Sequence, residues 1–437
     1  MASGVAHVKV CVVGLWHLGT VTAACLASRG HEVVGYDANL ETTSRLENAE
    51  PPISEPGLPE LLREATGAGR LRFTSDATLA LGDAEVVWVA FDTPVDDDDR
   101  ADVDFVIRSV ERLLPRMHRG ALVLISSQVP VGSTKRLEQA AASAGRTDLS
   151  FVYSPENLRL GKAIEVFTNP DRVVVGVRKE SDRASIEQLL APFTSRIEWM
   201  SVESAEMTKH ALNAFLATSV AFINEIATIC EHVGADAKEV ERGLKSEIRI
   251  GPGAYLGPGG AFAGGTLARD VVFLSATGRK AGVPTNLIDG IKSSNDAHRG
   301  WAKRRLQELL GELRGQRIAV WGLTYKPGTD TLRRSSAVEL CRALAQGGAK
   351  VIAHDPAVKA LPSDLAASIC LASDPIAALK DAVALVVMTE WPEYRQIDGA
   401  AMVEALDGRL VLDANRFLAK QLEDNPRITY ATVGKAV

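Results

Sequence analysis

Short apolar runs alternate with amphipathic stretches along the N-terminal part of the chain, and this alternation constrains the fold most. Continuous apolar runs are typical of strands buried on both faces of a sheet, and helical stretches between them supply the crossovers of a parallel sheet. The sequence therefore predicts a doubly wound α/β domain with a parallel sheet. The six predicted strands lie in residues 8–14, 31–37, 84–90, 121–127, 149–154 and 171–177.

The same alternation returns near the C-terminus, in residues 316–322, 349–355, 384–390 and 409–415. Between the two halves, residues 202–233 contain neither proline nor glycine and carry apolar residues at helical spacing, which predicts one long helix ending at Gly234. Helical stretches on either side of a glycine-rich loop should complete this centre. We therefore expect two Rossmann-like α/β domains joined by a central helical region, with boundaries at 1–200, 201–311 and 312–437.

Composition narrows the classes of function. With 437 residues the chain is too long for a single core, and a net charge of −6 offers no basic field for nucleic acid. The first 14 residues lack a basic segment followed by a long apolar one, so we expect a cytoplasmic protein with no membrane partner. The cysteines form no CxxC pair and indicate no metal site; they are interpreted as core residues in a reducing compartment: Cys11, Cys25, Cys230, Cys341 and Cys370.

A glycine turn follows the first predicted strand, in VCVVGLWHLG at residues 10–19. Gly14 and Gly19 match a dinucleotide-binding turn, but Trp16 stands where that pattern has its second glycine. Asp37 ends the second strand and would accept hydrogen bonds from a ribose diol, which favours NAD over NADP because a 2′-phosphate would be repelled. The alternative is a tight turn without a ligand.

Several stretches, in order, resemble the UDP-glucose/GDP-mannose dehydrogenase family, whose members use NAD to oxidise the 6-hydroxymethyl group of a nucleotide sugar. The resemblance covers almost the whole chain and implies an NAD domain, a dimer-forming helical centre and a C-terminal domain for the nucleotide sugar. The stretches include GLWHLG (14–19), ISEPGL (53–58), SPENLRLGKAI (154–164), GGTLARD (264–270), GLTYKPGTDTLR (322–333) and TEW (389–391).

The resemblance also implies the roles of individual residues. The catalytic set is Glu156, Lys209, Asn213 and Asp270, with Thr266 at the position of the family's cysteine. The cofactor set is Gly14, Trp16, His17, Leu18, Gly19, Asp37, Thr93, Pro94, Gln128 and Arg333. The substrate set is Leu158, Arg159, Arg249, Tyr255, Gly265 and Lys326. Lys326 and Arg333 stand where C-terminal basic residues contact the nucleotide sugar, and Arg249 where an arginine reaches the partner subunit's substrate.

The catalytic residue types suit these roles. Lys209 and Asn213 are four residues apart on one helix, so a cation and an amide can address the same oxygen. Glu156 follows a strand and could act through water as a general base. Asp270 would hold the same water or pair with Lys209.

Thr266 changes the chemistry that the resemblance implies. In the family a cysteine adds to the intermediate aldehyde and a thioester is then hydrolysed, whereas a threonine hydroxyl is un-ionised at neutral pH and no histidine lies nearby in sequence. Leu160 also replaces a glutamate, and Arg269 a lysine. We therefore expect a subgroup that oxidises without a cysteine thioester, with Thr266 only donating or accepting a hydrogen bond, and whose reaction stops at the aldehyde or proceeds through its hydrate.

Two alternatives stay open at this point. Trp16 and Thr266 together would also fit a protein that binds NAD and a nucleotide sugar but has lost redox activity. No residue decides the base or the sugar, and UDP-hexose is expected from its frequency in the family. The apolar long helix predicts a homodimer built on the helical centre.

Overall fold

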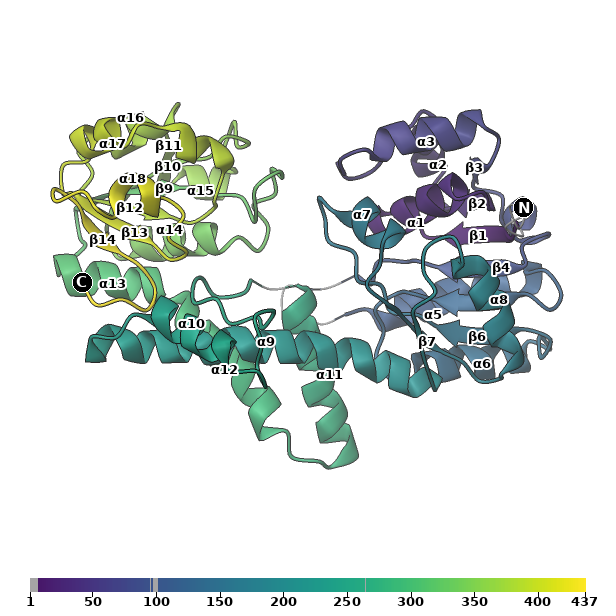
Figure 1. Cartoon of the computed structure of the whole chain (residues 1–437). Helices are drawn as coiled ribbons and strands as arrows, with labels where there is room; N and C mark the ends of the chain where they lie inside the picture. The colour runs from purple at the N-terminus through teal and green to yellow at the C-terminus, as the bar shows by residue number, and fades with distance from the viewer. Residues whose placement is uncertain (1–6, 95, 97–100, 264) are drawn as a thin grey trace. The chain divides into compact units, whose positions relative to one another are not determined.

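The computed structural model describes residues 7–94, 96, 101–263 and 265–437. The chain divides into two compact units, Met1–Leu212 and Asn213–Val437, and each unit contains one mainly parallel sheet with helices packed against it (Figure 1). The predicted fold class is thereby confirmed. The three domain boundaries stay a prediction.

The first sheet has eight strands in the order β3-β2-β1-β4-β5-β6-β7-β8. All pairs are parallel except β6 with β7, where Tyr153 opposes Gly176 in antiparallel register. An antiparallel segment at one side is common in doubly wound sheets. The strands are β1 (Lys9–Val13), β2 (Glu32–Tyr36), β3 (Leu71–Thr74), β4 (Val86–Val89), β5 (Leu122–Ile125), β6 (Ser150–Tyr153), β7 (Val173–Gly176) and β8 (Ile197–Met200).

Helices cover both faces of this sheet (Figure 1). One core contains apolar side chains of α1 (His17–Ser28), α2 (Leu40–Glu47), α3 (Leu58–Gly67), α7 (Ala163–Thr168) and α8 (Ser181–Leu190). The other contains those of α4 (Ala77–Leu81), α5 (Val103–Leu113), the short helix η1 (Leu114–Arg116) and α6 (Ser133–Ser143). Strands buried between two helix layers explain why they read as continuous apolar runs.

The second sheet has six parallel strands in the order β11-β10-β9-β12-β13-β14. They are β9 (Arg317–Trp321), β10 (Lys350–His354), β11 (Ile369–Leu371), β12 (Ala384–Val387), β13 (Leu410–Asp413) and β14 (Thr429–Ala431). Its faces are covered by α13 (Trp301–Leu310), α14 (Ser336–Gln346) and α15 (Ser363–Ala366) on one side, and by α16 (Pro375–Leu379), η2 (Pro392–Gln396), α17 (Gly399–Ala405) and α18 (Ala419–Leu422) on the other.

The assignment of every cysteine to the core was wrong for Cys370, which is exposed. It lies on the short edge strand β11, and alternate residues of an edge strand face solvent. The other four cysteines are buried.

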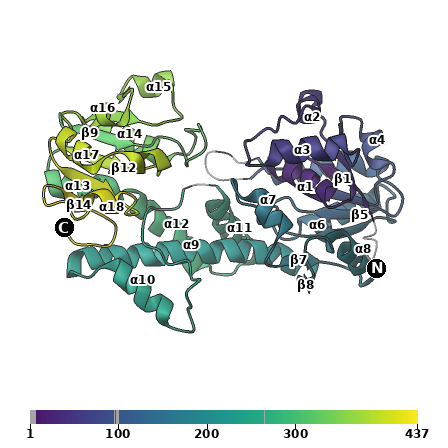
Figure 2. The ribbon, with the colours of Figure 1, turned by 45° about the horizontal axis from the view of Figure 1, so that its top comes forward.

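The predicted long helix is α9 (Val202–Val233). Its residues Ala214, Ala217 and Ala221 pack against Val271 of α11 (Thr266–Ala281) and Ile291 of α12 (Asn286–Arg299) (Figure 2). The helical stretch expected after the glycine-rich loop is divided into three helices, α11, α12 and α13. Gly282, in the left-handed conformation, ends the first of them.

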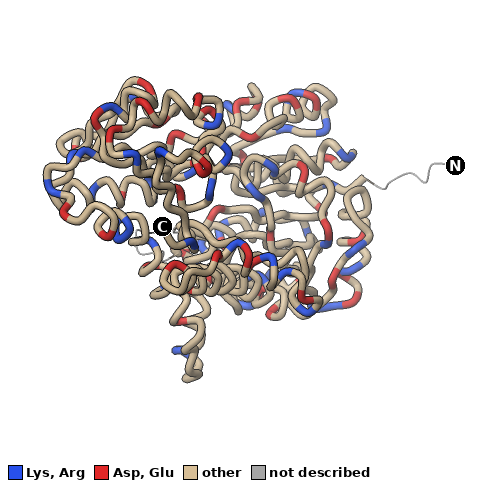
Figure 3. The backbone as a smooth tube through the Cα atoms, turned by 60° about the vertical axis from the view of Figure 1, so that its left-hand side comes forward, with Lys and Arg blue, Asp and Glu red and all other residues tan. Residues whose placement is uncertain are grey.

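By length and hydropathy, α9 meets the criterion for a membrane-spanning helix, and 50% of its most apolar window is buried in protein. Core helices of soluble proteins meet the same criterion, so this single helix is weak evidence for a membrane. Figure 3 shows basic and acidic residues interspersed along the described chain.

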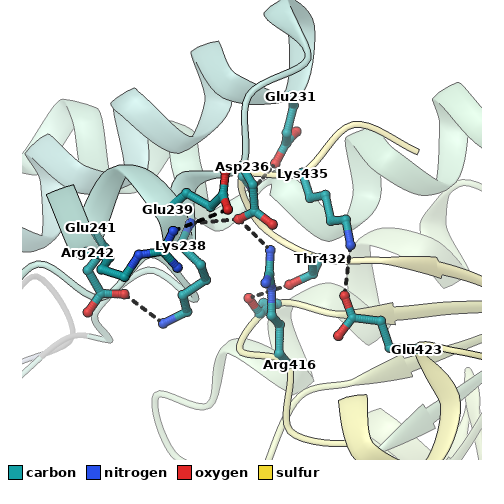
Figure 4. Close-up of polar contacts among 12 residues, drawn as sticks. Glu231, Asp236, Lys238, Glu239, Glu241, Arg242, Arg416, Glu423, Thr432 and Lys435 are labelled. Atoms are coloured by element: carbon teal, nitrogen blue, oxygen red, sulfur yellow. Dashed lines mark hydrogen bonds and ion pairs between the residues drawn. The ribbon is translucent and has the colours of Figure 1, made fainter.

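A network of ion pairs fixes the C-terminal segment beside α10 (Ala237–Ser246) (Figure 4). Asp236, the N-cap of α10, accepts a hydrogen bond from Arg416 at 2.8 Å. Glu231 accepts the Gly434 N–H at 2.9 Å, and Lys435 pairs with Glu423 at 2.9 Å. These contacts hold the start of α10, the helix that precedes Arg249.

Candidate active site

The turn between β1 and α1 requires both of its glycines. Gly14 has φ of +89°, in the left-handed region, and its N–H donates to the Tyr36 carbonyl at 3.1 Å. A Cβ atom on Gly19 would lie 1.8 Å from the Gly14 carbonyl oxygen. The close approach of strand and helix therefore depends on these two residues.

Trp16 does not strain this turn. Its φ of −81° and ψ of −154° are extended values that any residue adopts, so the missing second glycine is no steric obstacle to the fold. The side chain is half exposed at the N-terminus of α1, whereas Leu18 is buried in the core.

The carboxylate of Asp37 stabilises the same turn. One oxygen accepts the Leu15 N–H at 3.1 Å, and the other accepts the Asn39 N–H at 2.9 Å. The turn thus offers the N-terminus of α1 to a pyrophosphate and a carboxylate at the end of β2 to a ribose, which fits a dinucleotide.

Three further candidates lie where neighbouring strands end. Thr93, Gln128 and Glu156 follow β4, β5 and β6, which are adjacent in the sheet, so these residues share its carboxyl edge. The Thr93 hydroxyl donates to the Gln128 carbonyl at 2.7 Å. Pro94 comes next in the chain and is exposed.

Lys209 of α9 is buried and faces the Glu156 segment. Its Nζ atom donates to the Glu156 carbonyl at 2.6 Å and lies 4.0 Å from the Glu156 carboxylate. That carboxylate also accepts the Leu158 N–H at 2.7 Å. Leu158 packs against the core, and Arg159 is exposed. The structure therefore brings together the predicted cation and the predicted base.

The second unit carries the other candidates. Asn213 and Asp270 are buried, and the Asn213 amide donates to the Asp270 carboxylate. Thr266 is exposed and is the first residue of α11; Gly265 before it has φ of +108°. A Cβ atom on Gly265 would lie 3.8 Å from the Tyr325 hydroxyl, so the β9–α14 loop lies close to the glycine-rich loop.

The remaining candidates lie on loops of this unit. Lys326 and Arg333 belong to the segment between β9 and α14. The Arg249 side chain is 85% exposed and pairs with Glu247 at 3.0 Å. Tyr255 is exposed as well. Nothing in the structure tests the roles assigned to the site residues, so these roles stay predictions.

Sequence reasoning missed the residues that hold the site loops in place. Asn224 accepts the Gly259 N–H at 3.1 Å, His298 lies 2.8 Å from the Gly259 carbonyl, and Asn295 bonds both backbone groups of Phe262. Burial lowers the pKa of His298, so its ring is kept neutral. Glu55 accepts hydrogen bonds from the Gly161 and Ala163 N–H groups and so holds the segment after Glu156. The only sequence signal was its place in ISEPGL.

Three family models match successive parts of the chain. They are described as the NAD binding domain (residues 8–194), the central domain (residues 203–297) and the UDP binding domain (residues 319–420) of the UDP-glucose/GDP-mannose dehydrogenase family. The chain belongs to this family. It is accordingly an NAD-dependent nucleotide-sugar dehydrogenase, as the resemblance implied.

Relatives in the family align over nearly full length. A UDP-glucose 6-dehydrogenase of Pseudomonas aeruginosa is 34% identical, covering 98% of this chain and 97% of the relative. Another from Rhizobium meliloti is 33% identical, covering 98% and 99%. The solved UDP-glucose dehydrogenase of Pyrobaculum islandicum superposes with a TM-score of 0.88 at 32% identity, covering 100% of both chains.

Proposed function

We propose that this enzyme oxidises the 6-hydroxymethyl group of a UDP-hexose, UDP-glucose first among them, without forming a covalent thioester. The similar proteins described above are UDP-glucose dehydrogenases, and this supports UDP-glucose as the substrate. The observation that carries the mechanism is Thr266, a hydroxyl exposed at the start of α11 at the position where the resemblance places a cysteine. The other catalytic candidates are kept: Lys209 donates to the Glu156 carbonyl in the first unit, and Asn213 donates to the Asp270 carboxylate in the second.

Lys209 and Asn213 stabilise negative charge on the reacting oxygen. They lie one turn apart on α9, and burial strengthens a cation or an amide dipole aimed at a developing alkoxide. NAD, when bound at the turn after β1, supplies the hydride acceptor. The hydroxyl proton leaves through water to the Glu156 carboxylate, which is held by the Leu158 N–H.

The aldehyde formed in this way has two fates without a nucleophilic cysteine. It leaves as the product after one hydride transfer, or water adds to give the hydrate. The hydrate then loses a second hydride and a proton to give the carboxylic acid. Asp270, fixed by Asn213, and Glu156 are the carboxylates that would orient this water. Neither route needs a bond to Thr266.

The experiment is a turnover assay with UDP-glucose and NAD, followed by product analysis. One NADH per sugar identifies the aldehyde, and two identify the acid. Intact-mass analysis of enzyme quenched during turnover should show no sugar adduct, and Thr266→Ala should keep measurable activity, losing about 1 to 2 kcal/mol for one hydrogen bond. An adduct on Thr266, or no NADH from any UDP-hexose, would overturn the proposal.

We also propose that a second copy of the chain covers α9. Phe215, Phe222 and Ile229 repeat every seven residues and are 69%, 47% and 56% exposed. Such a stripe is the seam of a helix pair, and apolar side chains of this size are stabilised by burial.

A further inference from the structure

Glu55 is a buried carboxylate that contacts two segments of the first unit at once, the start of α1 and residues 161–163. Its side chain is 1% exposed and lies in the segment between α2 and α3. One oxygen accepts the Ala163 N–H at 2.8 Å. The other accepts the Gly161 N–H at 2.8 Å and lies 3.0 Å from Nε2 of His17. All three contacts bridge positions far apart in sequence.

The two segments have different predicted functions, one in binding the cofactor and the other in carrying the general base. His17 is the first residue of α1, directly after the turn that suits a dinucleotide. Gly161 and Ala163 end the segment that begins with Glu156 and contains Leu158 and Arg159. Within this unit, Glu55 therefore connects the cofactor turn with the segment that carries the predicted base.

The Glu55 carboxylate is ionised, and this determines which groups it can connect. Burial by itself would raise the pKa of Glu55, but hydrogen bonds from Gly161, His17 and Ala163 outweigh it, and the pKa lies below its ordinary value. An ionised carboxylate only accepts hydrogen bonds, so it fixes His17 with its hydrogen on Nε2. Gly161, which donates to this oxygen, has φ of +87°, a left-handed conformation that glycine adopts without strain.

We infer that Glu55 is a positioning residue that couples occupation of the dinucleotide turn to the order of the loop 158–163, through His17 on one side and the Gly161 and Ala163 N–H groups on the other. The inference rests on the proposed function only for the role of that loop. A ligand at the turn reduces the motion of the start of α1 and therefore of His17. Because His17 and Gly161 share one oxygen of Glu55, the Glu55 carboxylate becomes better fixed, and the Gly161 and Ala163 amides exchange more slowly with solvent.

Amide hydrogen exchange of the full chain, with and without NAD, tests this directly. In the wild type, NAD should slow exchange at Gly161 and Ala163 by about threefold or more, the size expected for stabilising a local opening. In His17→Phe, which keeps the glycine turn and Asp37 but removes the donor, the slowing should vanish when exchange is measured at an NAD concentration that saturates this variant, as its own NAD titration establishes. Glu55→Gln should raise exchange of at least one of the two amides even without NAD, because only one of its two terminal atoms can still accept a hydrogen bond.

The control is Glu47→Gln, since Glu47 accepts the Phe73 N–H at 2.7 Å in the same unit but touches neither loop. It should behave as the wild type. If His17→Phe retains the NAD-dependent slowing, or Glu47→Gln abolishes it, the inference is overturned. If Glu55→Gln fails to fold, His17→Phe still tests the inference, because the His17 side chain is 15% exposed, against 1% for Glu55, and its replacement disturbs the core less.

A second readout separates this inference from the proposed substrate. Saturating UDP-glucose should tighten NAD binding by about 5-fold or more in the wild type, within the usual range of coupling between sites, and His17→Phe should lower that factor at least about threefold. An equal factor in both proteins would contradict the inference. Failure of UDP-glucose to bind would contradict the proposed substrate alone, because the exchange experiment needs only NAD.

Discussion

A thiol introduced by Thr266→Cys should be easier to ionise than an ordinary exposed thiol. Thr266 begins a helix of 16 residues, and the N-terminal N–H groups of a helix attract an anion by about 0.3 to 1 kcal/mol. Since 1.36 kcal/mol corresponds to one pH unit, the midpoint of its titration should lie about 0.2 to 0.7 pH units lower than that of a matched thiol.

The matched control is Ala276→Cys, exposed on the same helix. Both positions have an arginine three residues later, Arg269 or Arg279. Four residues later, Thr266 has Asp270, which is buried and bonded to Asn213, and Ala276 has Lys280, so the control also carries Lys280→Ala to remove this extra cation. The assay is thiolate formation against pH in a Cys370→Ser background, which removes the exposed native cysteine. The buried native thiols will not interfere; burial raises the pKa of Cys25 and Cys341 to about 12, for example.

Equal midpoints for the two introduced thiols would refute the reasoning. This result would mean that the start of α11 does not lower the pKa of a thiol. A cysteine at position 266 would then not be sufficient for a covalent mechanism. A lower midpoint at position 266 would show that the start of α11 can activate a nucleophile placed there. The same variant, mixed with UDP-glucose and NAD, should then accumulate a thioester detectable by mass, because Leu160 stands where the family has a glutamate.

Three other perturbations test the remaining parts of the site and the assembly. Asp37→Ala should weaken NAD binding by about 1 to 3 kcal/mol in calorimetry, the loss expected for charge-assisted hydrogen bonds, and an unchanged dissociation constant would remove Asp37 from the site. Lys209→Ala should lower kcat about 10²-fold or more with little change in substrate affinity, because its cation acts on charge that develops in the transition state; equal losses in both would make it an anchor. Phe222→Glu should convert a dimer to a monomer in sedimentation, while a monomeric wild type would contradict the proposed interface.

Acid should destabilise the second unit through His298. Its folded pKa lies below the ordinary 6.5 because of burial, so the folded state binds fewer protons than the unfolded one as the pH falls below about 6.5. The stability from the neutral ring is therefore present above this pH and declines towards the lower folded pKa. His298→Gln should flatten this part of a urea-denaturation profile measured between pH 7 and about pH 5; an unaltered profile would assign the decline to other groups.

The strands that sequence analysis missed share one physical property. β3, β8, β11 and β14 are the outermost strands of the two sheets. Each of these strands has an exposed residue, so they lack the continuous apolar run that marks a strand covered on both faces. The exposed Cys370 has the same origin. Interior strands and the long helix were predictable because burial alone sets their pattern.

The site was predictable to the extent that its residues lie next to recognisable turns. Gly14, Gly19 and Asp37 carry a local pattern that the structure explains. Glu55 and Asn224 act through contacts with loops that are distant in the chain, and such contacts leave no periodic signal. The undisturbed backbone at Trp16 was also inaccessible to sequence reasoning, because it depends on a φ value rather than on a residue type.

Domain linkers are usually exposed, flexible and rich in proline or glycine. Here the only covalent passage between the two compact units, at Leu212–Asn213, lies inside an unbroken helix that contains neither. Lys209 and Asn213 stand on either side of this passage, and helical rise keeps them about 6 Å apart along the axis. Because both residues lie on this one helix, their spacing does not depend on a flexible linker.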